Sequence, residues 1–302
     1  MQPKTLIKKI IPRSIISFFR KAIYPEKIYI IENNLDSLLK TYYQKIAAPD
    51  FNQKISFRNA EFKVYSKHGG DGLLLYIFSK IGCQNRTFVE MGVEDGRECN
   101  TANLSLNFGW KGIIIDANKE WMESAQIFYR DKLGRSSGNV KAVHSFVTAE
   151  NINETISKNG ISGEIDMLSI DIDSNDYWVW KAINAVNPRV VVMEYNSALG
   201  LKPITVKYNP NFHYQKAYKE HPLYFGASLA ALAKLAKEKG YVLAGCDCHG
   251  HDAFFVRKDL AQGRFIELSP EEAFYPNPNA IQKIGSVEKQ FEQIKHLEFD
   301  YV

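Results

Sequence analysis

The sequence has 302 residues, of which 45% are hydrophobic and 24% are charged, and its formal net charge is +4. This composition is typical of a soluble protein with one large domain or two small ones, and so mild a charge does not indicate a nucleic-acid partner. Four cysteines in a chain of this length do not make a disulfide framework, so we expect a reducing, cytoplasmic setting.

The first 60 residues are expected to form a basic, mostly helical extension. Residues 1–30 place seven lysines and arginines among isoleucines, leucines and phenylalanines, with Glu26 as the one acid. No apolar run approaches the ~20 residues that cross a bilayer. Two interpretations stay open: a helix packed on the edge of the domain, or a helix lying on an anionic membrane, which would place the protein at the inner face of that membrane.

From about Tyr65 the pattern changes to short apolar runs separated by segments long enough for crossover helices. Runs without polar alternation are expected where helices cover both faces of a parallel sheet. Seven such runs predict strands: "RTFVEMGV", "KGIIIDAN", "VKAVHSFV", "DMLSIDID", "RVVVMEYN", "GYVLAGCD" and "AFFVRKD".

The last two strands flank an amphipathic helix and a tight loop. "ASLAALAKLAKEKG" predicts a helix that ends at Gly240, before the sixth strand. The loop "CHGH" is short enough for a hairpin, so the seventh strand should be antiparallel. The predicted fold is therefore α/β: a doubly wound, mostly parallel seven-stranded sheet with one reversed strand at its end.

The first two strands end in a pattern that indicates a nucleoside site. Glu90 ends the first strand, Gly92 and Gly96 follow it, and Asp116 ends the second strand. In open α/β sheets ligands bind beyond the carboxyl ends of the strands, and an acid at this distance commonly binds ribose hydroxyls. Two further acids in the turn would repel a pyrophosphate. They suit a ligand with a cationic aminoacyl end, such as S-adenosylmethionine (SAM).

The order and spacing of six stretches resemble a class I SAM-dependent methyltransferase, and in particular the FkbM-type group found in polysaccharide and natural-product clusters. In the first stretch, Lys67 and Gly70 stand where the group's pattern has Gln and Glu. The resemblance implies a methyltransferase domain over residues 61–275, between the extension of residues 1–60 and a helical tail of residues 276–302. The stretches are "YSKHGGDGLLLYIFSKIG", "FVEMGVEDGRECNT", "LSIDIDSNDYWVWKAI", "VVVMEYN", "YFGASLAALAKLAKEKGY" and "AFFVRKDL".

The same resemblance implies which residues contact the cofactor. The glutamate and the two glycines after the first strand would line the methionine part of SAM. The acid that ends the second strand would take the ribose hydroxyls, and two residues after the third strand would flank adenine. The candidate cofactor-binding residues are Glu90, Gly92, Gly96, Asp116, Ala117, Asn118, Ser145, Phe146 and Asp171.

Acids and an amide gather at the ends of the fourth and fifth strands. Asp171 and Asp173 lie on one face of an extended chain, and Glu194 and Asn196 end the neighbouring strand. Such oxygen ligands suit Mg²⁺ or Mn²⁺, so Asp173, Glu194 and Asn196 are candidate metal ligands. Metal-dependent small-molecule O-methyltransferases resemble this arrangement. Metal-free substrate binding and helix capping by Asp173 or Asp176 are the alternatives.

The hairpin loop "GCDCHGHD" concentrates cysteines and histidines. Cys246, Cys248, His249 and His251 are too close in sequence to form one tetrahedral zinc site together. Because the loop leaves a strand at its carboxyl end, His249 or His251 is a candidate general base, together with Asp171 and Asp173 as catalytic acids or bases. A surface hairpin tip is the alternative.

A long segment between Asn196 and Tyr224 has no clear secondary-structure pattern. Loops of this length are often functional lids, and its lysines and aromatic residues suit a sugar substrate. A solvated lid or a homodimer contact is the alternative. The candidate substrate-binding residues are Asp176, Tyr195, Lys207, Tyr208, His213 and Tyr224.

These patterns and the resemblance together predict a cytoplasmic SAM-dependent O-methyltransferase. Its substrate would be a hydroxyl of a carbohydrate or polysaccharide precursor, with a divalent metal assisting and with no nucleic-acid partner. A non-catalytic nucleoside-binding or assembly module with the same fold is the alternative. A nicotinamide oxidoreductase is disfavoured by the glycine spacing.

Overall fold

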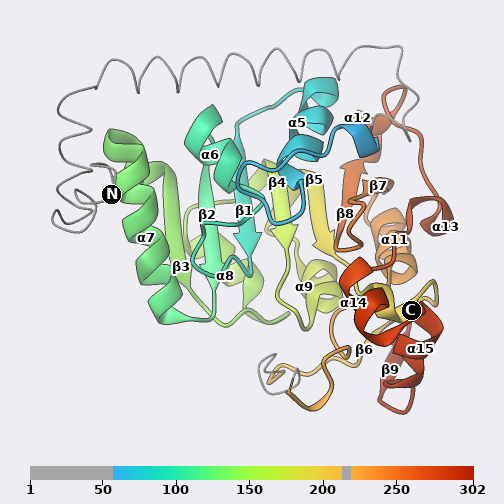
Figure 1. Cartoon of the computed structure of the whole chain (residues 1–302). Coiled ribbons are helices and arrows are strands. Elements are labelled where there is room, and N and C mark those ends of the chain that lie inside the picture. The colour runs from blue at the N-terminus through green and yellow to red at the C-terminus, as the bar shows by residue number, and fades with distance from the viewer. Residues whose placement is uncertain (1–56, 213–218) are drawn as a thin grey trace, which may run out of the picture. The chain divides into compact units, whose positions relative to one another are not determined.

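The computed structural model describes residues 57–212 and 219–302 (Figure 1). The basic segment of residues 1–30, nearly all of the predicted extension and the candidate residue His213 lie outside the described residues. Among the helices in the described ranges, none combines the length and the apolar character needed to cross a membrane.

One seven-stranded sheet forms the centre of the described chain, in the order β3-β2-β1-β4-β5-β8-β7 (Figure 1). Neighbouring strands from β3 to β5 are parallel, whereas β8 is antiparallel to both β5 and β7. The strands are β1 (Thr87–Met91), β2 (Lys111–Asp116), β3 (Val140–His144), β4 (Gly163–Ile170), β5 (Val186–Glu194), β7 (Tyr241–Cys246) and β8 (Asp252–Arg257).

This sheet confirms the predicted doubly wound, Rossmann-like fold of class I methyltransferases. All seven predicted strands are present, and the seventh in chain order is the reversed one. Its predicted position at the end of the sheet is wrong, because the β7–β8 hairpin pairs with β5 through β8. The reversed strand therefore lies inside the sheet, and β7 forms the edge.

Helices cover both faces of the sheet. On one face, Ile156, Trp180 and Leu232 pack with Leu168 and other strand residues in a single buried cluster. The helices of this face are α8 (Ile152–Lys158), α9 (Asp176–Ala182) and α11 (Leu229–Glu238); those of the other face are α5 (Gly70–Ile81), α6 (Ala102–Phe108) and α7 (Lys119–Leu133), which runs into the 3₁₀ turn η1 (Gly134–Asn139). Two-sided burial explains why the strands read as uninterrupted apolar runs.

The predicted helix before β7 is present as α11. Ser228 caps its N-terminus by accepting a hydrogen bond from the amide of Ala231 at 3.1 Å, and Gly240 follows its end with φ +84°. Leu229, Leu232 and Leu235 are at most 2% exposed. Each such side chain contributes about 1.5–3 kcal/mol by its removal from water.

The segment after β5 is partly ordered into secondary structure, unlike the loop that its sequence predicts. It contains η2 (Ser197–Leu199) and β6 (Ile204–Val206). Strand β6 pairs antiparallel with β9 (Phe299–Tyr301) near the end of the chain. Between β8 and β9 lie α12 (Lys258–Ala261), α13 (Pro270–Ala273), α14 (Pro278–Ile284) and α15 (Val287–Glu292); the last two lie close to β6 and β9 in Figure 1.

A buried ion pair joins the central strands β4 and β5. Asp166 in β4 is fully buried and lies 3.2 Å from the Nε of Arg189 in β5, which is 6% exposed. The carboxylate of Asp166 also accepts hydrogen bonds from the backbone amides of Gln84, Asn85 and Arg86. Asp166 therefore fixes the position of the loop between α5 and β1 relative to β4.

Candidate functional site

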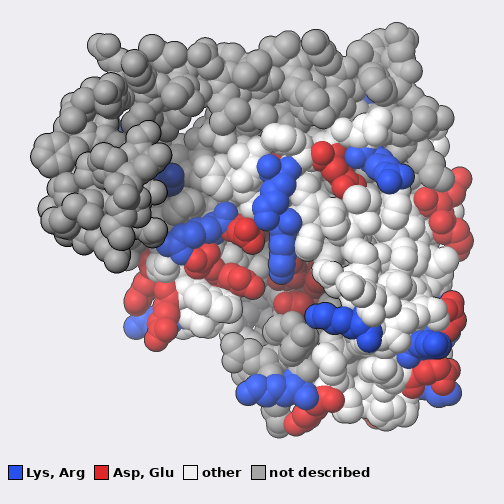
Figure 2. Space-filling model, in the orientation of Figure 1, with Lys and Arg blue, Asp and Glu red and all other residues white. Residues whose placement is uncertain are grey.

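A cavity of about 770 Å³ opens at the carboxyl ends of the strands. This volume is within the range of small-molecule sites, ~300–1,000 Å³. In the space-filling view, acidic side chains are recessed in a hollow on this face, with basic side chains beside them (Figure 2). The candidate residues that line the cavity are Glu90, Gly92, Asp116, Ala117, Asn118, Ser145, Phe146, Asp171, Asp173, Glu194, Tyr195, Asn196 and His251.

Gly92 lines the cavity. The sequence predicts a glycine here for contact with a ligand, but a contact within the protein already requires it. It adopts φ +76°, and a Cβ at this position would stand 1.5 Å from the carbonyl oxygen of Asp171. The amide of Asp171 also donates to the carbonyl of Met91 at 3.2 Å. Glycine is thus required because the chain leaving β1 passes directly against the chain leaving β4.

Gly96, which the sequence predicts to line the cofactor, is not part of the cavity wall, and a Cβ there would meet Ile114, Ala125 and Tyr129 at 3.1–3.2 Å. Glycine at this position lets the turn after β1 pack closely against β2 and α7.

Glu90 lies at the base of the cavity with its carboxylate bound to the protein. The side chain is 3% exposed and accepts hydrogen bonds from the amides of Asn100 and Thr101, at 2.8 and 2.9 Å, and from the Thr101 hydroxyl. Burial raises its pKa despite these donors. Because Oε1 accepts only one of these bonds, it is the oxygen of Glu90 that retains capacity for a ligand.

Asp116, the predicted ribose-binding acid, lines the cavity, and both of its carboxylate oxygens accept from backbone amides. One carboxylate oxygen accepts from the amide of Glu94 at 3.0 Å and the other from the amide of Asn118 at 2.8 Å. Each oxygen keeps a second lone pair for a hydroxyl. Beside it, the partly exposed rings of Phe146 and Trp121 contribute to the wall and provide flat apolar surface.

Three acids meet at the ends of β4 and β5. One carboxylate oxygen from each of Asp171, Asp173 and Glu194 lies within 4.8 Å of the others. Desolvation, with the neighbouring negative charges, raises the pKa of Asp171 and of Glu194 well above their usual values, and burial together with Asp176 raises that of Asp173 to about 7. Asp173 also adopts φ +52°, which is uncommon outside glycine.

Among the described residues, Lys67 is a cation that faces this cluster. Burial lowers its pKa, but the charges of Asp171, Glu94, Glu194 and Asp173 outweigh that effect and raise it. The loop that carries Lys67 is closed by Asp71, whose Oδ2 accepts from the amides of residues 64, 65 and 66 at 2.6–2.8 Å. The sequence placed Lys67 in a family-like stretch but gave it no role.

Two predicted polar residues are occupied by the protein itself. The Asn196 amide donates to the carbonyls of Leu223 and Phe225, and its oxygen accepts from the amide of Ala198, so this side chain braces the segment after β5. Asp176 is fully buried and accepts from the amides of residues 172 and 174. It shapes the turn after β4 and does not line the cavity as a substrate ligand.

Of the two candidate histidines, His251 lines the cavity and His249 does not. The Oδ1 of Asn277 accepts from two amides at the start of α14, so its Nδ2 is the group that faces His251 Nε2, at 2.9 Å. His251 Nε2 therefore accepts, and the ring proton is on Nδ1, 3.7 Å from Glu194 Oε1. In this tautomer neither ring nitrogen is free to act as the predicted general base.

Three of the predicted substrate residues, Lys207, Tyr208 and Tyr224, do not line the cavity. Lys207 forms an exposed ion pair with Glu298 at 3.0 Å. The Tyr208 hydroxyl donates to Glu150, and the Tyr224 hydroxyl donates to the carbonyl of Glu298. Tyr195 contributes to the wall, but it is 1% exposed and its hydroxyl is bound to the backbone of Tyr275. These residues fasten the segment after β5 to neighbouring loops and to the end of the chain.

Comparisons with protein-family models and with curated proteins give no match. Several solved structures with a similar chain path are methyltransferases. They include a proposed sarcosine dimethylglycine methyltransferase from Galdieria sulphuraria (15% identity, 57% of this chain and 61% of that one, TM-score 0.40). Others are magnesium protoporphyrin IX methyltransferase from Synechocystis with bound SAM (10%, 76% and 96%, 0.40) and a Bacillus cereus O-methyltransferase in complex with SAH (16%, 72% and 89%, 0.37). At these TM-scores the likenesses carry no inference about activity, and the fold assignment rests on the strand order.

Proposed function

We propose that this protein is a SAM-dependent O-methyltransferase of the FkbM-type group that acts on a hydroxyl of a carbohydrate or polysaccharide precursor. The observation that carries the proposal is that a single cavity contains two complementary ends. At the ends of β1 to β3 lie Asp116 and the Phe146 ring, which suit a nucleoside. At the ends of β4 and β5 lies the acid cluster, which suits hydroxyl groups.

Methyl transfer asks little covalent chemistry of the protein. The sulfonium of SAM activates its own methyl group, so the protein must align the acceptor oxygen with it, exclude water and accept one proton. The acid cluster, formed by Asp171, Asp173 and Glu194, binds the acceptor hydroxyls and takes the proton of the one that attacks. Lys67 limits repulsion among the three carboxylates, and His251 Nδ1 lies 3.7 Å from Glu194 Oε1.

The acid cluster also fits a divalent cation. Its donors are all carboxylate oxygens within 4.8 Å of one another, as Mg²⁺ or Mn²⁺ prefers. Asp171, Asp173 and Glu194 would hold the ion. When bound, such an ion polarises hydroxyl oxygens and lowers their pKa. Lys67 would then have to move away from the cluster, which makes metal dependence a direct experimental question.

Calorimetric titration of the full chain with SAM, with SAH and with NAD tests the cofactor. We expect SAM and SAH to bind and NAD not to bind. Asp116→Asn should weaken SAM binding by about 5–150-fold, the equivalent of ~1–3 kcal/mol for charge-assisted hydrogen bonds, whereas Asp131→Asn on the exposed side of α7 should not. Binding of NAD without SAM would refute the proposal. SAM binding without transfer to any glycan acceptor would favour the non-catalytic module.

A further inference from the structure

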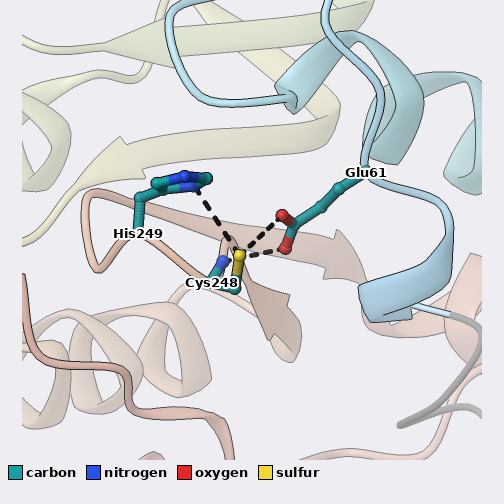
Figure 3. A group of neighbouring side chains, drawn as sticks. All are labelled: Glu61, Cys248 and His249. Atoms are coloured by element: carbon teal, nitrogen blue, oxygen red, sulfur yellow. Dashed lines mark hydrogen bonds between the residues drawn. The ribbon is translucent and has the colours of Figure 1, made fainter. Parts of the chain in front are cut away.

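Outside the cavity, three side chains converge at the tip of the β7–β8 hairpin. Cys248 and His249 belong to the hairpin loop, and Glu61 comes from the loop before α5, 187 positions away from Cys248. One donor atom from each residue lies within 4.8 Å of the other two. Figure 3 shows the thiol between the carboxylate and the imidazole, with both groups turned toward it. We propose that Glu61, Cys248 and His249 bind a zinc ion, and this proposal does not depend on methyl transfer.

The donor distances are close to those of a zinc site. Cys248 Sγ lies 3.7 Å from His249 Nδ1. Tetrahedral zinc, with Zn–S of ~2.3 Å and Zn–N of ~2.0–2.1 Å, holds such a pair roughly 3.5 Å apart. Cys248 Sγ lies 2.9 Å from Glu61 Oε2, to which it donates a hydrogen bond. On metal binding this thiol proton leaves to solvent, the Zn–S bond forms in its place, and the sulfur–oxygen distance opens by roughly 0.6 Å.

The charge and chemistry of the three donors favour zinc over magnesium. A thiolate, a carboxylate and a neutral imidazole exactly balance the charge of one divalent ion. Thiolate and imidazole are ligands that zinc prefers and that Mg²⁺ and Ca²⁺ do not. Cys246 is not part of the group, because it is 3% exposed and lies against Tyr195. With three protein ligands, water would fill the fourth position on the exposed side of His249.

Both loops are held in place without the ion. The buried carboxylate of Asp247 accepts from the amide of His249 at 2.7 Å and from the amide of Asp252. The amide of Cys248 donates to Glu61 Oε1 at 2.8 Å. The ring of His68 stacks on both His249 and His251, with centroids 5.2 and 4.2 Å away. The ion would therefore fasten the loop that carries Lys67 and His68 to the hairpin that carries His251, and so fix one wall of the cavity.

Metal content and cobalt spectroscopy of the full chain test this site. Protein prepared without chelator should contain about one equivalent of zinc, and Co²⁺ bound in its place should show a thiolate-to-cobalt absorption band. Cys248→Ser should abolish the band. His249→Ala should weaken Co²⁺ binding by at least ~10–100-fold, since loss of even an outer-sphere partner has that effect.

Matched control variants test whether the zinc content and the cobalt band come from this site. Cys83→Ser changes an exposed free cysteine and should leave both the zinc content and the band unchanged. Asp173→Asn should also keep the band, because the acid cluster offers only oxygen. A circular-dichroism spectrum equal to wild type would show that Cys248→Ser folds. Zinc-free protein that binds Co²⁺ without a thiolate band, or with a band that survives in Cys248→Ser, would overturn the site and leave a hydrogen-bonded thiol.

Discussion

Replacement of Gly92 by alanine tests whether the acid cluster is positioned by a backbone crossing. Gly92 and Gly109 have nearly the same backbone conformation, with φ +76° and +70°. A Cβ on Gly92 would stand 1.5 Å from the Asp171 carbonyl oxygen, whereas a Cβ on Gly109 would have no atom within 4 Å. Gly109→Ala is therefore a control with the same conformational strain and no collision.

The expected magnitudes follow from this difference. A left-handed conformation costs a non-glycine residue ~1–2 kcal/mol, and both variants carry that cost. Overpacking adds ~1–3 kcal/mol or more, and only Gly92→Ala carries it. The obstacle is a backbone oxygen, which no rotamer change can move away. The free energy of unfolding should thus fall by at least ~1–3 kcal/mol more in Gly92→Ala than in Gly109→Ala, a large share of the ~5–15 kcal/mol typical of a domain.

Urea unfolding followed by circular dichroism measures both variants, with SAM titration of the folded fraction beside it. Gly92→Ala should also weaken SAM binding, because relief of the collision must displace Asp171. That loss alone would not show that Gly92 touches the cofactor. Equal midpoint shifts in the two variants, at equal slopes, would refute the claim that the crossing of the chains after β1 and β4 requires glycine.

Two further outcomes concern the cluster and the sheet. Asp173→Asn should lose transfer while SAM binding persists, and EDTA should lower turnover that Mg²⁺ or Mn²⁺ restores; full activity in metal-free enzyme would exclude the cation and leave the carboxylates as direct acceptors. Asp166→Ala should lower the free energy of unfolding by about 3–5 kcal/mol in urea, because it leaves Arg189 buried without its partner and three amides without an acceptor; a loss below ~1 kcal/mol would contradict this account.

The strands and the strand-end acids could be predicted because they depend on local patterns. An uninterrupted apolar run indicates a strand in a sheet that helices cover on both faces. An acid that follows such a run must lie at the carboxyl end of that strand. Asp116, Asp171 and Glu194 were found in this way. The position of β8 could not be found, since the sequence permits a hairpin but does not say which of its strands pairs with β5.

The sequence did not predict the roles of side chains whose partners lie far away along the chain. Asn196 was predicted from its position after β5, but its amide nitrogen donates to the carbonyls of residues 223 and 225, which lie far along the chain. His251 looked like a base until Asn277, beyond the predicted methyltransferase domain, fixed its tautomer. Lys67 enters the cavity because a loop closes on Asp71. In each case the chemistry of a side chain is set by a partner that no spacing rule identifies.

The negative charge of the acid cluster restricts the class of acceptor that the proposed enzyme can use. The sequence predicts that the lysines of the segment after β5 suit a sugar, but Lys207 pairs with Glu298 outside the cavity. Among the described residues, Lys67 is the lysine that lines the cavity beside the acid cluster. Two like charges about 4 Å apart repel by about 4 kcal/mol at an effective dielectric constant near 20. An anionic sugar would meet this repulsion from each acid of the cluster that is ionised, whereas a neutral hydroxyl would not. With metal-free enzyme, neutral glycosides should therefore accept the methyl group and matched uronic-acid glycosides should not; equal rates for the two would show that the cluster is already neutralised when the acceptor binds.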